Sequence, residues 1–311
     1  MHDQKLVSII LPAFNAEEYI SDAIDSILNQ TYIGWELIII YDKSSDQSLD
    51  IIKDYIKKDS RISLVYNPAK GLISALNHGI KISKGDFIAR MDADDISMPD
   101  RIELQIKHMI LNNLDICGCH HQIINDKGDL GKVIYNPLSH EHCFIKLLSA
   151  VPFAHPSVVI RKDFIIKTNL RYGMNTNMLA EDLDMWINMF NAGAIFGNIN
   201  KVKLRYRILN SSLSRKYPKL LMNESLIFYN TFFNKNLERI STILNNKIEF
   251  SNNNDRYYFL RMVIRYIIRK RKISKLNKLL FSNMSILFKA SLVEMKNYIF
   301  QISLNFNKKN K

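Results

Sequence analysis

Cysteine, glycine and proline are all scarce in this chain of 311 residues, which contains three Cys, ten Gly and seven Pro. Three cysteines cannot form a disulfide framework, so a disulfide-stapled scaffold is excluded and a reducing compartment is indicated. The low Gly and Pro content excludes collagen-like and linker-rich chains. Hydrophobic residues make up 47% and charged residues 23%, which excludes global disorder and allows a large core.

Long hydrophobic runs are also missing, since no segment reaches the ~18 apolar residues that a membrane-spanning helix requires. The start of the chain has no signal-peptide pattern, because Pro12 and Glu17 follow the apolar run 6–11 without a small-residue cleavage site. We therefore expect a cytoplasmic protein. The motifs G-x-G-x-x-G and G-x-x-x-x-G-K-[ST] are absent, which argues against dinucleotide-binding and P-loop proteins.

Charge is divided unevenly along the chain. Residues 1–200 carry 19 Lys+Arg and 25 Asp+Glu, a net charge of −6, whereas residues 201–311 carry 24 and 5, a net charge of +19. An acidic front and a basic back indicate parts with different tasks. We predict a catalytic domain over residues 1–215 and a basic, helical C-terminal extension over residues 216–311.

Strand and helix patterns alternate through the first hundred residues. Apolar and β-rich runs predict strands at 7–11, 35–41, 62–66 and 87–91, and helical spacing predicts helices at 19–28, 48–56 and 72–82. Ser97 and Pro99 predict the start of a further helix that runs to Met109. This order predicts an α/β fold with an open, mostly parallel sheet flanked by helices, whose ligands bind beyond the carboxyl ends of the strands.

Three acidic residues, Asp92, Asp94 and Asp95, follow the predicted strand 87–91. Carboxylates gathered at a strand end repel one another unless they are solvated or share a cation. Their oxygens suit Mg²⁺ or Mn²⁺, with phosphate oxygens completing the coordination. A polar loop that caps the following helix explains the same residues equally well.

A second acidic cluster, Glu181, Asp182 and Asp184, precedes the apolar stretch 185–187. An acid near a cleft can act as general base if it reaches the proton that it removes. A helix N-terminus enriched in acids is the commoner origin of such a pattern.

Two further residues raise the question of nucleotide binding. Phe14 follows the first predicted strand and Asp42 follows the second. An aromatic ring can stack on a base, and a carboxylate can accept an N–H from uracil. Ordinary loop chemistry between strands and helices is the alternative.

Together these motifs resemble glycosyltransferase family 2, the inverting class with the GT-A fold. The resemblance covers about residues 5–215 and is carried by VSIILPAFNAEEYISDAIDSILNQTY, WELIIIYDKSSDQS, KGLISALNHGIKISKGDFIARMDADDISMPDRIELQ, HPSVVIRK, AEDLDMW and YRILNSSLS. It implies a GT-A fold, which is Rossmann-like, with the basic helical extension beyond it.

The resemblance also implies roles for single residues. It places a Mn²⁺ or Mg²⁺ ion on Asp94, with Asp92 near both the metal and the ribose and Asp95 beside them. Phe14 and Asp42 would bind the nucleotide base, and Asp182 would be the catalytic base with Glu181 beside it as a substrate-binding residue.

The substrates that the resemblance implies are a UDP-sugar donor and a saccharide acceptor. The donor sugar would be glucose, galactose or an N-acetyl form, and the acceptor would be carried by a polyprenyl diphosphate. The product would be a bacterial surface polysaccharide: O-antigen, capsule or lipopolysaccharide.

Three positions depart from the family pattern. Tyr41 replaces the first of two acids after the second strand, Lys43 replaces a glycine, and Leu209 replaces a histidine of the last element. His155 is a conceivable substitute for that histidine. The absence of the family histidine at position 209 keeps an alternative open: a non-catalytic or nucleotidyltransferase-like nucleotide-binding protein.

The C-terminal region contains basic residues at helical spacing beside an apolar stripe. The basic positions are Arg261, Arg265, Arg269 and Lys272, and a second amphipathic pattern covers 284–302. A helical subdomain packed on the catalytic domain and docking on an anionic membrane surface explain them equally well. The second would make the protein peripheral on the inner face of the cell membrane. Nucleic-acid binding is disfavoured because no such motif is present.

Cysteines and histidines also cluster at 117–121 and 140–143. Such residues can bind zinc. The stretch 116–124 reads as a strand, however, whose successive side chains point to opposite faces and cannot converge on one ion. We therefore expect a structural strand here.

Overall fold

The computed structural model describes residues 5–176, 179–209 and 212–245. Internal contacts group residues 1–147 and 151–228 into one unit, and residues 148–150 and 229–311 into another. The boundary at residue 215 stays a prediction about which parts fold independently. The basic amphipathic segments predicted between residues 261 and 302 lie outside the described residues.

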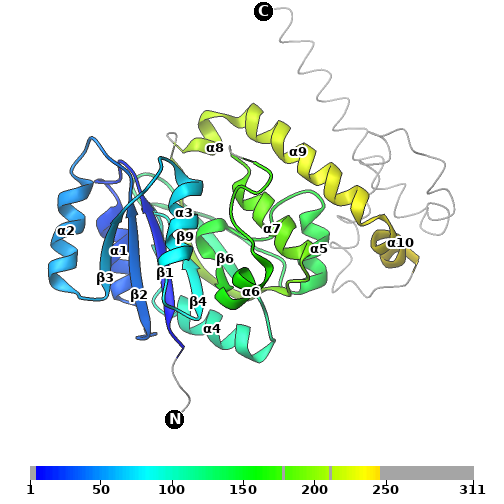
Figure 1. Ribbon diagram of the computed structural model, residues 1–311, viewed down its shortest axis with the longest axis horizontal. Helices are drawn as coiled ribbons and strands as arrows, with labels where there is room; N and C mark the ends of the chain where they lie inside the picture. The colour runs from blue at the N-terminus through cyan, green and yellow to red at the C-terminus, as the bar shows by residue number, and fades with distance from the viewer. Residues whose placement is uncertain (1–4, 177–178, 210–211, 246–311) are drawn as a thin grey trace, which may run out of the picture. The chain divides into compact units, whose positions relative to one another are not determined.

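The first unit is built on a single sheet, which has nine strands in the described part of the chain (Figure 1). Its order is β3-β2-β1-β4-β8-β6-β9-β5, and β7 pairs with β6. The strands are β1 (Val7–Ala13), β2 (Trp35–Tyr41), β3 (Ile62–Tyr66), β4 (Phe87–Arg90), β5 (Ile96–Ser97), β6 (Ile116–Ile124), β7 (Leu130–Ile134), β8 (Val159–Arg161) and β9 (Phe196–Arg207).

Two groups of parallel strands meet in this sheet. Strands β3, β2, β1 and β4 are parallel to one another, and β6 is parallel to β9. Strand β8 is antiparallel to both β4 and β6, and it joins the two groups. The predicted mostly parallel α/β sheet is therefore confirmed.

Helices flank the sheet, and several begin and end where the sequence predicts. They are α1 (Ile20–Leu28), α2 (Ser48–Lys58), α3 (Leu72–Ile82), α4 (Arg101–Leu111), α5 (His140–Leu147), α6 (Lys162–Thr168), α7 (Glu181–Asn191), α8 (Leu213–Lys216), α9 (Pro218–Lys235) and α10 (Leu237–Asn245). Helix α9 crosses from the first unit into the second at Phe228. Among the described residues, the model contains no helix with the length and hydropathy needed to cross a membrane.

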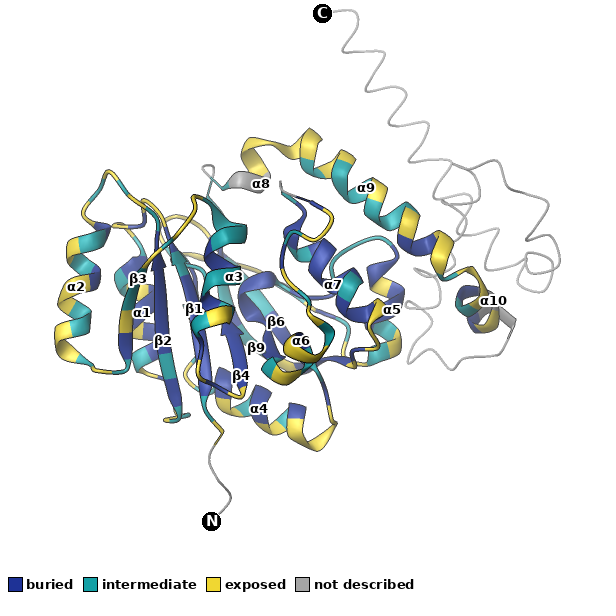
Figure 2. Cartoon of the chain, in the orientation of Figure 1, coloured by how far each residue is buried: buried dark blue, intermediate teal, exposed yellow. Residues whose placement is uncertain are grey.

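The core lies on both faces of the parallel strands. Ile9 and Leu37 on one face and Ile10 and Ile38 on the other are each at most 3% exposed, as expected for strands covered by helices on each side (Figure 2). Burial of these branched side chains removes apolar surface from water at about 25 cal/mol per Å². It fixes the strand register, and therefore which loops meet at the carboxyl ends of the strands.

The predicted start of the fourth helix is wrong by four residues. Ser97 belongs to β5 and pairs with Leu204 of β9, and α4 begins at Arg101. Pairing with a strand more than one hundred residues away determines the backbone of Ser97, and local sequence does not reveal that partner. The Ser97 hydroxyl instead accepts a 2.7 Å hydrogen bond from the buried guanidinium of Arg101.

The cysteine- and histidine-rich stretch forms β6, as expected. Cys117 and Cys119 are fully buried free thiols on one face of this strand. Burial raises the pKa of the Cys119 thiol to about 11. Within the part of the chain that the structure describes, the one group of three or more acidic, His or Cys side chains close enough to share an ion is Asp92, Asp94 and Asp95.

Candidate active site

A cleft with a volume of about 890 Å³ opens at the carboxyl ends of β1, β2 and β4. Its lining comes from separate stretches of the first unit, at residues 12–19, 42, 45–46, 70–72, 75, 90, 92–94, 155–156, 179, 181–182, 206–207, 209, 212 and 221. These include six of the seven residues that the sequence proposes for a site: Phe14, Asp42, Asp92, Asp94, Glu181 and Asp182. The seventh, Asp95, is buried next to Asp94.

Reciprocal hydrogen bonds hold together the loops that follow β1 and β2. The Asn15 main-chain N–H donates to Oγ of Ser44 at 3.0 Å, and the Ser45 N–H donates to Oδ1 of Asn15 at 2.9 Å. Asn15 has a φ of +46°, a left-handed conformation that asparagine tolerates better than most residues. The turn leaves the neighbouring ring of Phe14 52% exposed at the cleft wall.

The carboxylate of Asp42 is oriented by two donors from the segment before α3. It accepts a 2.9 Å hydrogen bond from the Gly71 N–H and a 3.1 Å bond from Nδ2 of Asn67. Gly71 has a φ of +103°, which glycine adopts without the strain that a Cβ would cause. The side chain of Asp42 is therefore held in the cleft on the same side as Phe14.

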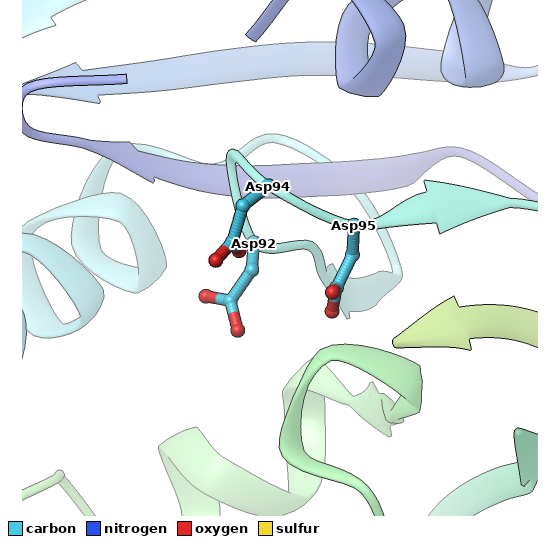
Figure 3. A group of neighbouring side chains, drawn as sticks. All are labelled: Asp92, Asp94 and Asp95. Atoms are coloured by element: carbon cyan, nitrogen blue, oxygen red, sulfur yellow. The ribbon is translucent and has the colours of Figure 1, made fainter. Parts of the chain in front are cut away.

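Asp92, Asp94 and Asp95 form a compact acidic group in the loop after β4. Each offers a carboxylate oxygen within 4.8 Å of the others, and the three side chains extend to the same side of the loop (Figure 3). Burial, together with the charge of Asp92, raises the pKa of Asp94 to about 6 and holds that of Asp95 well above its ordinary range. A cation placed among these carboxylates would remove their repulsion.

One oxygen of the group has no protein partner. Oδ2 of Asp95 is buried and accepts no hydrogen bond from the described residues. An all-oxygen donor set of this size suits a hard divalent cation. Asp92, Asp94 and Asp95 thus fit Mg²⁺ or Mn²⁺.

Two arginines that the sequence analysis did not single out hold this acidic loop. Arg90, on β4, is 5% exposed, lines the cleft and forms an ion pair with Asp92. Arg207, at the end of β9, donates its main-chain N–H to Asp95 at 2.7 Å and Nε–H to the Asp94 carbonyl at 2.8 Å. The signal for Arg90 was a basic residue inside an otherwise apolar strand, and the signal for Arg207 was its place in the stretch YRILNSSLS.

The residues of the second acidic cluster have different surroundings: one is buried in the structure and two line the cleft. Asp184 is fully buried and accepts hydrogen bonds from the N–H and Nδ2 of Asn175 at 3.0 and 2.7 Å. Glu181 and Asp182, at the start of α7, line the cleft. Burial raises the pKa of Asp182, and burial beside the Asp182 charge raises that of Glu181 to about 8. Both carboxyls therefore hold a proton more readily than exposed acids do.

The family model for glycosyl transferase family 2 matches residues 8–170, more than half of the chain. The chain belongs to glycosyl transferase family 2. The O-antigen biosynthesis glycosyltransferase WbnJ of Escherichia coli is 33% identical over 219 residues, which cover 68% of this chain and 82% of WbnJ. The UDP-Glc:alpha-D-GlcNAc-diphosphoundecaprenol beta-1,3-glucosyltransferase WfgD of Escherichia coli is 34% identical over 260 residues, which cover 78% of this chain and 92% of WfgD.

Solved structures agree on the fold of this family 2 transferase. TarS residues 1–349 of S. aureus, crystallised with UDP-GlcNAc, superpose with a TM-score of 0.61 at 16% identity over 92% of this chain and 79% of TarS. The mannosyltransferase PcManGT of Pyrobaculum calidifontis, in complex with GDP-Man and Mn²⁺, gives a TM-score of 0.57 at 12% identity over 94% and 87%. The predicted GT-A fold is confirmed.

The positions where this family 2 member departs from the family pattern differ in their surroundings. Tyr41 is 4% exposed, and its hydroxyl accepts a hydrogen bond from the Ser44 N–H, so it belongs to the core. Leu209 lines the cleft. His155 also lines the cleft, with Nδ1 3.7 Å from the Glu181 carboxyl, and burial lowers its pKa well below the usual value.

The segment that leads into α7 is anchored by Glu224 of α9. The Glu224 carboxyl accepts hydrogen bonds from the main-chain N–H groups of Leu179 and Ala180 at 3.0 and 3.1 Å, and from the hydroxyl of Thr176. These contacts fix the backbone immediately before Glu181. Sequence reasoning had no means of finding them, because Glu224 lies more than forty residues beyond the segment that it holds.

Proposed function

We propose that this protein is an inverting glycosyltransferase that moves a hexose from a UDP-sugar to a saccharide acceptor carried by a lipid diphosphate. The observation that carries the proposal is a single cleft lined by Phe14 and Asp42, by Asp92 and Asp94, and by Asp182. One cavity therefore contains groups suited to a nucleotide base, to a diphosphate with its cation, and to an incoming hydroxyl.

The nucleotide end of the donor would bind between the loops after β1 and β2. The exposed ring of Phe14 offers a stacking surface. The oriented carboxylate of Asp42 can accept the N3–H of uracil, which a purine base does not present in the same place. TarS, which has the same fold, is known in complex with UDP-GlcNAc and with UDP, which supports a uridine donor.

The diphosphate would lie at the acidic loop. Asp94 and Asp92 would hold Mn²⁺ or Mg²⁺ there, with Asp95 behind them. A divalent cation in that position supplies Lewis-acid stabilisation of the negative charge on a departing diphosphate. The protein contributes a loop already fixed by Arg90 and Arg207, so that the carboxylates need little rearrangement.

Asp182 would act as the general base on the acceptor side of the cleft. Its carboxylate would take the proton of the acceptor hydroxyl as that oxygen bonds to the anomeric carbon, while the bond from this carbon to the diphosphate breaks. Burial raises the pKa of Asp182 and so brings it closer to the working pH, which suits a group that accepts a proton during the reaction. A single displacement inverts the anomeric centre and gives a β-linkage from an α-linked donor.

The acceptor class rests on the relatives. WfgD is named for transfer to a sugar-diphosphoundecaprenol, and this chain matches 92% of its length. WbnJ is named for O-antigen biosynthesis. We infer a role in the synthesis of bacterial O-antigen, capsule or lipopolysaccharide, with glucose, galactose or an N-acetyl form as the transferred sugar.

The presence of Leu209 in the cleft favours a second candidate, a nucleotide-binding relative without transferase activity or with nucleotidyltransferase chemistry. A donor screen decides between the two. The purified protein is incubated with Mn²⁺, with each common sugar nucleotide and with a synthetic sugar on a lipid diphosphate, and the product linkage is read by NMR. A β-linked product from one UDP-sugar is expected. Binding of UDP without transfer from any donor would favour the second candidate.

A further inference from the structure

A short exposed segment of the first unit combines positive charge with large apolar side chains. Arg215, Lys216 and Lys219 are exposed, and Tyr217, Leu220 and Met222 between and beside them are 45%, 38% and 57% exposed. We call these six residues the α8–α9 rim. In Figure 2 the ribbon is largely coloured as exposed from the end of α8 into the start of α9.

The three bases of the α8–α9 rim are not balanced by acids, in contrast to Lys203 and Arg207 before them, which pair with Asp100 and Asp22. Residues 201–223 contain seven Lys or Arg and no Asp or Glu. Among the residues that the structure describes, no carboxylate lies within ion-pair distance of Arg215, Lys216 or Lys219, although exposed Lys53 and Lys57 of α2 pair with Asp50 and Asp54. The α8–α9 rim is therefore a local cationic surface, not a solvated face with mixed charge.

The rim borders the candidate active site. Ser212, just before α8, and Leu221, in the first turns of α9, both line the cleft that contains Asp182. They flank the exposed residues 215–220 in the chain. A molecule bound to the rim would therefore lie beside the cleft that contains Asp182.

We propose that the α8–α9 rim docks on an anionic lipid surface and so presents a membrane-borne acceptor to the cleft. Interleaved bases and exposed apolar side chains match such a surface, where the charges meet anionic headgroups and the apolar groups enter the interface. The remainder of this chain is an unsuitable occupant, because residues 246–311 carry 15 Lys or Arg against 3 Asp or Glu and would be repelled. The part of this proposal that concerns the acceptor rests on the proposed function.

The test uses the full chain and vesicles of phosphatidylcholine with or without phosphatidylglycerol. The rim variant, Arg215→Glu/Lys216→Glu/Lys219→Glu, reverses three charges on the rim. The control variant, Lys53→Glu/Lys57→Glu/Lys58→Glu, makes the same charge change on α2. Each base near an anionic surface contributes about fivefold in affinity, so the rim variant should bind anionic vesicles at least about a hundredfold more weakly than the parent. The α2 variant should lose less than about fivefold.

Transfer assays separate docking from the acceptor class. With a water-soluble, short-chain acceptor, the rim variant should transfer at the parent rate, a result that also shows that the variant folds. With the acceptor embedded in anionic vesicles, the rim variant should transfer more slowly than the parent. If the parent uses no acceptor but its vesicle binding still depends on the rim, the docking proposal is supported and the proposed acceptor is wrong. Equal loss of vesicle binding in the two triple variants would overturn the proposal. The proposal would also be overturned if the parent bound neutral vesicles, or a DNA oligonucleotide, as tightly as it binds anionic vesicles.

Discussion

The main-chain N–H of Arg207 donates a 2.7 Å hydrogen bond to Oδ1 of Asp95, which lies 112 residues earlier in the chain. The Arg207 side chain adds a 2.8 Å bond from Nε to the Asp94 carbonyl and two 3.0 Å bonds to the carbonyls of Asn125 and Asp126. The end of β9 thus fixes the shape of the acidic loop before any ligand binds.

Replacing Arg207 should therefore loosen the loop and destabilise the fold. Arg207→Met removes three part-buried hydrogen bonds from the guanidinium to main-chain carbonyls, which should lower the free energy of unfolding by about 2–4 kcal/mol. Lys201→Met, on an exposed position of the same strand, should change it by less than about 0.5 kcal/mol. Urea denaturation of both variants tests this, and equal stabilities would contradict the assigned role.

Metal binding should depend on Asp94. Removing even an outer partner of a metal ligand costs about 10–100-fold in affinity, so Asp94→Ala should weaken Mn²⁺ binding in the presence of UDP by at least about 100-fold. Asp50→Ala, an exposed acid on α2, is the matched control and should leave affinity unchanged. Calorimetric titration measures both. Transfer that persists undiminished in EDTA would remove the cation from the scheme.

The proton on Glu181 should show in the pH dependence of stability. Its pKa is raised in the folded protein to about 8, so the folded state holds a proton that the unfolded state releases at lower pH. The contribution of this carboxyl therefore lowers the free energy of unfolding as pH rises from about 5 to 8. Glu181→Gln removes that cost, and its Tm relative to the parent should increase over this range. The exposed Glu238→Gln should show no such trend, and a flat difference for Glu181→Gln would exclude a raised pKa.

Glu224 should influence catalysis through the backbone that it holds. Glu224→Ala frees the N–H groups of Leu179 and Ala180 just before Asp182, and a small displacement of a reacting group costs roughly 10–100-fold in rate. We expect kcat to fall while the KM for the donor stays close to the parent value. Glu224→Gln, which keeps an acceptor oxygen, should recover part of the rate. Asn223→Ala on the exposed side of α9 should have no effect, and a Glu224→Ala kcat equal to the parent's would refute this role.

The sequence predicted the fold well where structure is determined locally. The strands 35–41 and 62–66 and the helix 72–82 have the predicted bounds, because hydrophobic periodicity and burial agree there. The residues proposed for the site, Phe14, Asp42, Asp94 and Asp182 among them, do meet around one cleft, since parallel strands bring their carboxyl ends to the same edge. Their chemical roles stay predictions.

What the sequence missed depends on partners far away in the chain. The strand at Ser97 exists because β9 pairs with it. Arg207 and Glu224 make contacts that join segments separated by tens of residues. Arg90 pairs with nearby Asp92, but the strand pattern alone does not show that its side chain turns to the acidic loop. Such contacts follow from the assembled fold and not from local periodicity.

The central claim is that Asp182 accepts the proton of the acceptor hydroxyl, and the Asp182→Asn variant tests it most directly. Transfer and donor affinity are measured on the same preparation, by product formation and by titration with the UDP-sugar and Mn²⁺. Loss of a general base should reduce kcat by about 10²–10⁴-fold, whereas donor affinity should change by less than about threefold, under 1 kcal/mol. A variant that binds donor normally and transfers at the parent rate would contradict the account.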